Sequence, residues 1–145
     1  AQALEFAESV AQQGGLTPQL DKLASDLTVA GRKRLELARA LALKPRLLLL
    51  DEPLAGLNSQ EAHALATTIA EINQQGLTIV LIEHNLGEVM RICRRLVVLD
   101  NGKKIGDGEP RTVMADPVVR AAYLGGDTVG AAAAGAHPDS EEQHA

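Results

Sequence analysis

The residues with the clearest chemical potential are two adjacent carboxylates, Asp51 and Glu52, which follow the apolar run 47–50 and precede Pro53. A short continuous apolar run is typical of a strand that is buried on both faces, as in a parallel sheet. The carboxylates would then lie at the carboxyl end of this strand, where open α/β sheets bind ligands. In phosphate chemistry, one such acid holds a magnesium ion and the other holds a water molecule. The alternative is a strand that ends in an acidic turn.

A second polar group follows a second apolar run. Residues 77–82 are rich in β-branched side chains, which indicates another buried strand. Glu83, His84 and Asn85 come directly after it. A single histidine in such a place is more often structural than catalytic. Two strands that deliver Asp-Glu and His to one edge of a sheet nevertheless favour a shared site there.

A loop of small residues precedes the Arg-rich helical pattern at residues 32–42. The free amides and the dipole of this helix would face whatever lies at its N-terminus. The alternative is an ordinary junction between a loop and a helix, and the basic cluster 32–34 is interpreted as a solvated face. The loop consists of Leu27, Thr28, Val29, Ala30 and Gly31.

Periodicity and turn residues predict the remaining elements. Asn58 is expected to cap the helix that follows it, with Glu61 as its reciprocal partner. Asn101 and Gly102 predict a hairpin turn, and we expect this hairpin to form the antiparallel edge of an otherwise parallel sheet. The predicted helices cover residues 1–12, about 18–24, 32–42, 59–75, 86–93, 111–114 and 117–124, and the predicted strands cover 47–50, 77–82, 96–99 and a return strand through Ile105.

Composition limits the possible functions. The chain has 145 residues, 46% of them hydrophobic, which is enough for one domain with a core. The net charge of −5 comes mostly from the last stretch, and Phe6 and Tyr123 are the only aromatic residues. A near-neutral body with so few aromatic side chains argues against nucleic-acid binding. A single cysteine, Cys93, excludes an internal disulfide framework and fits a reducing compartment.

In their order and spacing, these stretches closely resemble the second half of an ATP-binding cassette (ABC) ATPase, over about residues 3–124. The resemblance implies an α/β fold, namely the C-terminal part of a P-loop (RecA-like) ABC ATPase domain. Its sheet would be mostly parallel with a terminal antiparallel hairpin, and part of the helical signature subdomain would precede it. Residues 1–45 would form the helical part, 46–125 the core part and 126–145 a disordered acidic tail.

The resemblance also implies roles for individual residues. Asp51 would hold Mg²⁺, generally through water, and Glu52 matches the catalytic glutamate that orients and polarises the attacking water. His84 matches the switch histidine that contacts the γ-phosphate of ATP. Residues 27–31 match the signature loop, usually Leu-Ser-Gly-Gly-Gln, which serves an ATP bound to the partner subunit. Asn58 lies in the D-loop, usually Leu-Asp, where Asn removes a charge from the dimer interface.

One part of the family pattern does not occur in the 145 residues. The sequence contains no G-x-x-x-x-G-K-[ST] motif, and its only Gly-Lys pair, Gly102-Lys103, lies in the hairpin turn. The Gln loop of the family is missing as well. We therefore expect the isolated chain to bind ATP weakly or not at all and not to hydrolyse it. Because the sequence also lacks an initiator Met, we expect it to begin inside a larger protein.

Within the family, the Ala55-Gly56-Leu57-Asn58 turn, the Glu83-His84 pair and the ending at 116–125 look like the ATP-binding subunits of bacterial branched-chain amino acid importers. This resemblance implies ATP and Mg²⁺ as cofactors. It implies a second, identical or homologous ABC ATPase subunit and integral membrane permease subunits as partners. It also implies a peripheral location on the cytoplasmic face of the bacterial inner membrane, and no nucleic-acid partner. Two alternatives are a truncated cassette that only docks to a partner and a cassette ATPase of DNA repair or translation.

Overall fold

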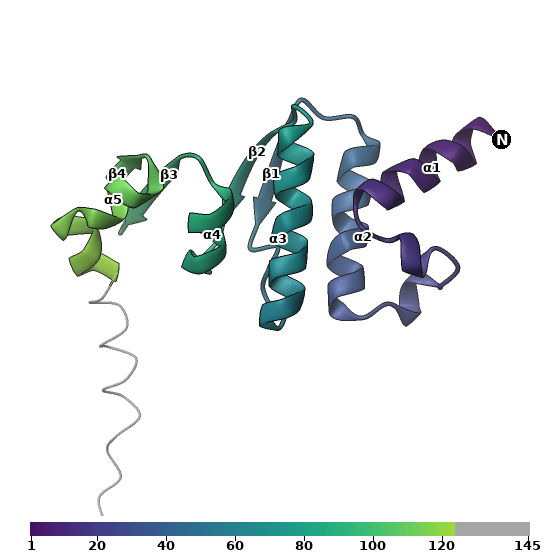
Figure 1. The fold of residues 1–145 in the computed structure, drawn as a ribbon, viewed down its shortest axis with the longest axis horizontal. Coiled ribbons are helices and arrows are strands. Elements are labelled where there is room, and N and C mark those ends of the chain that lie inside the picture. The colour runs from purple at the N-terminus through teal and green to yellow at the C-terminus, as the bar shows by residue number, and fades with distance from the viewer. Residues whose placement is uncertain (124–145) are drawn as a thin grey trace, which may run out of the picture. The chain divides into compact units, whose positions relative to one another are not determined.

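The computed structural model describes residues 1–123 of the chain. The described residues form two compact units, 1–93 and 94–123 (Figure 1). The predicted division at residues 45/46 falls inside the first unit and stays a prediction, and the predicted tail at residues 126–145 lies outside the described residues. Among the helices of residues 1–123, none combines the length and the hydrophobicity needed to cross a membrane.

The first unit combines helices with two strands. The expected helices and strands of this unit are confirmed, except for the short helix over about 18–24. That prediction is wrong because residues 17–26 include no buried side chain, so no apolar face supports a longer helix. The elements in chain order are α1 (Gln2–Gln13), the 3₁₀ turns η1 (Thr17–Gln19) and η2 (Ala24–Asp26), α2 (Val29–Ala42), β1 (Leu47–Asp51), α3 (Ser59–Gln74), β2 (Thr78–Ile82) and α4 (Leu86–Ile92).

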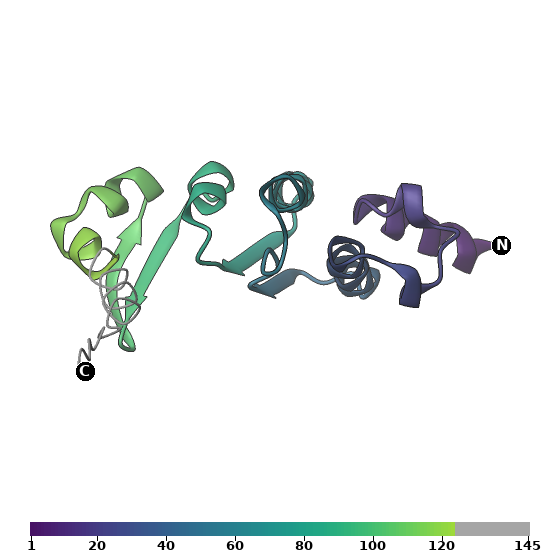
Figure 2. The same ribbon diagram turned by 90° about the horizontal axis from the view of Figure 1, so that it is seen from below.

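The strands β1 and β2 pair in parallel, as predicted, and one face of the pair packs on the core of the first unit. The register places Leu48 opposite Ile79 and Asp51 opposite Ile82. Figure 2 shows α3 and α4 on the same side of the two strands. On this side Leu48 belongs to the same buried cluster as Leu65 of α3. Burial of such side chains stabilises the unit by about 25 cal/mol per Å² of apolar surface removed from water.

The opposite face of the strand pair is open within residues 1–123, which corrects the prediction that both strands are buried on both faces. Leu49 and Ile82 lie on this face and are 68% and 60% exposed, whereas Leu48 on the covered face is 6% exposed. A separate groove of about 240 Å³ is lined by residues of α2, β1 and α3, Leu37, Leu48 and Leu65 included, and so does not belong to the open face. An apolar run in a sequence predicts burial, but it does not identify the elements that would cover each face.

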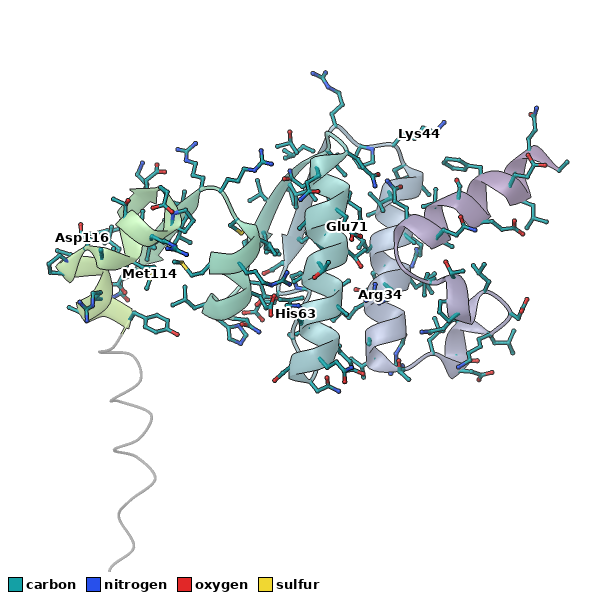
Figure 3. The ribbon with its side chains drawn as sticks, in the orientation of Figure 1. Arg34, Lys44, His63, Glu71, Met114 and Asp116 are labelled. Atoms are coloured by element: carbon teal, nitrogen blue, oxygen red, sulfur yellow. The ribbon has the colours of Figure 1, made fainter. Side chains whose placement is uncertain are left out.

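Arg34 connects three helices of the first unit (Figure 3). Its guanidinium Nη1 donates to the carbonyl oxygen of Gly14, at 3.3 Å, and to Thr68 Oγ1, at 3.0 Å. Burial lowers the pKa of Arg34 from its ordinary value. The prediction of a solvated face for residues 32–34 is therefore wrong for Arg34, because the helix turns this side chain toward the end of α1 and toward α3.

A polar contact joins α3 to α4. His63 Nδ1 lies 3.1 Å from Glu88 Oε1, and Arg91 Nε donates to Glu88 Oε2 at 2.8 Å (Figure 3). Partial burial raises the pKa of Glu88, but the hydrogen bonds with Arg91 and His63 outweigh this effect, and the pKa lies below its ordinary value. The Glu88 carboxylate is therefore a stabilising link between the two helices.

Replacing Glu88 by Gln is expected to reduce the loss of stability of the chain in acid. Because the folded-state pKa is depressed, the carboxylate stabilises the fold above its ordinary pKa of about 4.3, and this contribution is lost as the pH falls through the lower folded-state value. The check is the free energy of urea unfolding measured from about pH 3 to pH 7. Glu71→Gln, at an exposed position of α3, is the control. The same acid dependence in wild type and Glu88→Gln would contradict the prediction.

The described part of the second unit is a hairpin followed by helices. Asn101 and Gly102 have positive φ values of 47° and 76°, which confirms the predicted hairpin turn. Among the described residues, β3 pairs with β4 in antiparallel fashion, and the prediction that this hairpin forms an edge of the parallel sheet stays a prediction. The turn residues set the pairing within the hairpin but do not specify contacts with another sheet. The elements are β3 (Leu96–Asp100), β4 (Lys103–Gly108) and α5 (Pro110–Ala115), and residues 117–123 are helical as well.

Two features hold this hairpin in place within its unit. At Gly106 a Cβ atom would lie 2.7 Å from Val113 Cγ1, so only glycine allows the close packing of α5 on β4. Asp107 accepts hydrogen bonds from Arg95 Nε, at 2.8 Å, and from Lys104 Nζ, at 3.0 Å. These two cations hold the pKa of the Asp107 carboxyl well below its usual range.

Candidate functional site

The structure brings two of the predicted catalytic side chains together where β1 and β2 end. His84 Nδ1 lies 3.5 Å from Glu52 Oε1, and the two side chains are 75% and 53% exposed. Glu52 N donates to the carbonyl oxygen of Ile82 at 2.8 Å, which extends the pairing of the two strands by one residue. The predicted common edge of Glu52 and His84 is therefore present, and both groups remain accessible to a ligand.

Glu52 has an unusual backbone conformation. Its φ of 46° lies in the left-handed region, which costs a residue other than glycine about 1–2 kcal/mol. The loop after it compensates through local contacts, because Ala55 N donates to the Glu52 carbonyl oxygen at 3.1 Å and the Leu54 side chain is buried at 4% exposed. Strained residues that the surrounding structure holds in place cluster at functional sites, which makes Glu52 a candidate on backbone grounds as well.

Asp51 is the last residue of β1 and its side chain is exposed. Residues 1–123 contain no group of three or more His, Cys, Asp or Glu side chains that would enclose a metal ion by itself. Mg²⁺ in nucleotide sites is usually held by one or two carboxylates together with phosphate oxygens and waters. The adjacent carboxylates of Asp51 and Glu52 fit this kind of donor set, and the predicted metal role of Asp51 stays a prediction.

The predicted loop at residues 27–31 is shorter than expected. The helix α2 begins at Val29, so Val29, Ala30 and Gly31 form its first turn, which corrects the assignment of all five residues to a loop. The cause is Thr28, whose Oγ1 accepts a hydrogen bond from Gly31 N at 3.1 Å and caps the helix, a contact worth about 1 kcal/mol. Leu27 is buried at 8% exposed and anchors the start of the segment.

The start of α2 lies near the loop that follows β1. A Cβ atom placed on Gly56 would lie 3.8 Å from Val29 Cγ1, and Val29 is 45% exposed. Gly56 has a φ of 78°, which the turn between β1 and α3 requires. The helix start and the turn after β1 therefore form adjoining parts of one surface of the first unit. The nucleotide-binding role of residues 27–31 stays a prediction.

Asn58 acts as the predicted helix cap. Its Oδ1 accepts from Glu61 N at 2.9 Å, and Glu61 Oε2 accepts from Asn58 N at 3.2 Å, which completes a capping box at the start of α3. Asn58 is exposed. The side-chain oxygen therefore serves the helix, and the assignment of Asn58 to a dimer interface stays a prediction.

Glu83 is a residue of this region whose contacts could not be foreseen from the sequence. The sequence assigns it no role beyond its place after β2 and its part in the Glu83-His84 pair, yet its carboxylate is half-buried and accepts hydrogen bonds from both strand-end loops. Its place directly after an apolar strand was a signal, but the partner on the other loop is 29 residues away in the chain. Local sequence patterns cannot predict such a contact.

Two family models match separate parts of the chain. The one described as "ABC transporter" matches residues 1–55, and the one described as "Branched-chain amino acid ATP-binding cassette transporter" matches residues 103–129. The two matches lie at either end of the chain, one before and one after the residues that join β2 to α4.

Curated relatives and solved structures agree with these matches. The chain is 38% identical over 125 residues to the high-affinity branched-chain amino acid transport ATP-binding protein BraF of Pseudomonas aeruginosa, covering 86% of the chain and 49% of the relative. It is 39% identical over 126 residues to the corresponding protein LivG of Escherichia coli, with the same coverage. It is 34% identical over 124 residues to the lipopolysaccharide export system ATP-binding protein LptB of Haemophilus influenzae, covering 86% of the chain and 52% of that protein.

Among solved structures, an ATP-binding cassette of an ABC transporter in its ADP conformation matches with a TM-score of 0.77 and 31% identity, over 86% of this chain and 51% of that one. A nucleotide-free ATP-binding cassette matches with a TM-score of 0.76 and 29% identity, over 85% and 50%. The chain thus spans about half the length of the relatives and structures that it matches.

Proposed function

Because the chain belongs to the ATP-binding cassette (ABC) transporter family, we propose that it is the C-terminal part of an ATP-hydrolysing subunit of an ABC importer. The observation that carries the proposal is the 3.5 Å approach of His84 Nδ1 to Glu52 Oε1, at the carboxyl ends of two parallel strands. Open α/β sheets bind their ligands at this edge. Exposed acid and imidazole groups at one edge suit phosphoryl transfer to water, which depends on positioning and charge stabilisation.

The proposed mechanism assigns one task to each side chain. The Glu52 carboxylate would accept a hydrogen bond from the attacking water, orient it and take its proton as the new O–P bond forms and the bond between the γ-phosphorus and the ADP oxygen breaks, so that ADP leaves. The His84 imidazole would donate a hydrogen bond to an oxygen of the γ-phosphate. Asp51 would hold Mg²⁺, which, when bound with ATP, offsets negative charge on the phosphate oxygens. Residues 27–31 and Asn58 would face an ATP bound mainly by a second subunit.

The proposed substrate of the transporter is a branched-chain amino acid. The match of residues 103–129 to the branched-chain family model and the 38–39% identity to BraF and LivG support this choice. The relatives named for lipopolysaccharide export, at 34–37% identity, keep export as a second candidate. The direct test compares the uptake of labelled leucine by cells with and without the gene. Loss of uptake in cells without the gene is expected for an importer of branched-chain amino acids, and unchanged uptake would favour export.

The proposed partners are a second ABC ATPase subunit, identical or homologous, and integral membrane permease subunits. The proposed location is the cytoplasmic face of the bacterial inner membrane. The names of BraF and LivG as transport ATP-binding proteins support both proposals. A docking module without catalysis is the alternative proposal for the 145 residues taken by themselves, which contain no G-x-x-x-x-G-K-[ST] motif.

The isolated 145-residue chain is expected to show no saturable binding of a fluorescent ATP analogue and no ATP hydrolysis above background. The reason is that a Gly-rich loop and its lysine normally hold the phosphates, and the 145 residues contain neither. The matched sample is a protein in which a cassette half with this motif precedes the chain, and it should bind and hydrolyse ATP. Hydrolysis by the 145 residues that disappears in Glu52→Gln would contradict the expectation. Inactivity of the longer protein would support the docking module instead.

A further inference from the structure

We propose that Glu83 is a positioning residue that fastens the loop after β1 to the loop after β2 and so holds Glu52 beside His84. The inference rests on the proposed function, because only that function makes the distance between Glu52 and His84 important. It concerns the contacts of this chain alone and does not depend on a nucleotide being bound.

The two carboxylate oxygens of Glu83 serve different loops. Oε1 accepts a hydrogen bond from Leu54 N at 2.8 Å, two residues beyond Glu52. Oε2 accepts from His84 N at 3.2 Å and from Asn85 N at 3.4 Å. A carboxylate has only acceptor sites and can take several N–H donors at once, so one side chain joins both loops.

Two hydrogen bonds link the chain at and just after Glu52 to β2 and to the loop that follows β2. On its strand side, Glu52 N donates to the carbonyl oxygen of Ile82 at 2.8 Å. On its other side, Leu54 N donates to Glu83. These two links bracket the left-handed backbone of Glu52, whose φ is 46°. Without the second link, this strained residue would be held by its bond to Ile82, by the turn and by the buried Leu54 side chain, but nothing would join the two loops beyond the strand ends.

A purely local role for Glu83 explains less of the geometry. The start of α4 has its own cap, because Asn85 Oδ1 accepts from Glu88 N at 3.3 Å. Glu83 is therefore not needed to begin that helix, and its shortest hydrogen bond goes to Leu54, on the other loop. This cross-loop bond is the feature that a cap or an ordinary turn would not require.

The first test is amide hydrogen exchange by NMR on the 145-residue chain. In Glu83→Ala, exchange at Leu54 is expected to rise by about tenfold or more relative to the amides within β1 and β2. In Glu83→Gln the rise should be smaller, because one acceptor oxygen remains. Glu71→Ala, an exposed change on α3, is the control and should leave Leu54 as in wild type. Unchanged exchange at Leu54 in Glu83→Ala, or an equal rise throughout the first unit, would overturn the proposal.

The second test asks whether Glu83 positions Glu52 or only stabilises the loop. In wild type, Glu52→Gln should shift the NMR signals of the His84 ring, since the two side chains lie 3.5 Å apart. In the Glu83→Ala background, the same Glu52→Gln change should shift them by less than half as much. An undiminished response would show that Glu83 does not control this approach.

If Glu83→Ala does not fold, amide exchange in Glu83→Gln, compared with Glu71→Gln, tests the proposal instead. The glutamine loses one acceptor, so exchange must rise at Leu54, His84 or Asn85, and no rise at any of them refutes the proposal. None of these measurements involves ATP. If the exchange and His84 ring measurements give the expected results but the ATPase assay fails, only the proposed function is rejected. If the ATPase is active but Glu83→Ala changes neither the exchange at Leu54 nor the response of the His84 ring, only the role of Glu83 is rejected.

Discussion

Glu52→Gln, made in a protein that joins this chain to a phosphate-binding half, is expected to lower the rate of ATP hydrolysis by about 10²–10⁴-fold. The glutamine keeps the size of the side chain and can still contact water, but it cannot take up a proton. ATP binding should persist, because Glu52 is not proposed to hold the phosphates. The ATP-bound dimer should accumulate, and size-exclusion chromatography with ATP present would detect it.

The control for this variant is Glu71→Gln, which makes the same chemical change at an exposed position of α3. It should hydrolyse ATP at the wild-type rate. Unchanged turnover in Glu52→Gln would reject Glu52 as the catalytic acid. Loss of both binding and turnover would point instead to a collapsed loop, which the Leu54 amide signals distinguish from a chemical defect.

Leu65→Ala is expected to destabilise the 145-residue chain by about 2–5 kcal/mol. Leu65 is 2% exposed, lies on α3 and belongs to the same core cluster as Leu48 of β1 and Ile69. Removing three carbon atoms there loses their transfer free energy and leaves a cavity that the surrounding helices cannot fully close. The free energy of urea unfolding, monitored by circular dichroism, is the measurement.

The matched control is Leu49→Ala, the same substitution on the open face of β1, where Leu49 is 68% exposed. Its cost should stay within about 0.5 kcal/mol, as for most surface changes. Equal effects of the two substitutions would mean that the open face of the strand pair is covered in solution. That result would contradict the one-sided core described above.

Residues with local partners could be predicted from the sequence. The capping partners Asn58 and Glu61 are three positions apart and the turn at Asn101 and Gly102 spans two residues, so both follow from side-chain chemistry and backbone freedom. Apolar runs likewise located β1 and β2, and parallel strands end at a common edge. The meeting of Glu52 with His84 was therefore predictable as a consequence of two local patterns.

Contacts between distant residues were decided only by the tertiary structure. The basic cluster 32–34 predicted a solvated face for Arg34, but its hydrogen bonds to Gly14 and to Thr68 of α3 leave it half-buried. The continuous apolar runs predicted strands covered on both faces, but the described residues cover only one face. A run of apolar residues indicates burial but does not specify which elements pack on each face.

The sequence by itself determined which residues end the two strands and what chemistry their side chains offer, because these properties depend on residues close together in the chain. The tertiary structure alone decided that Glu52 adopts a left-handed backbone and that Glu83 reaches Leu54. These outcomes depend on which groups find partners after the chain folds, and Leu54 and Glu83, 29 positions apart in the chain, carry no local signal of their hydrogen bond.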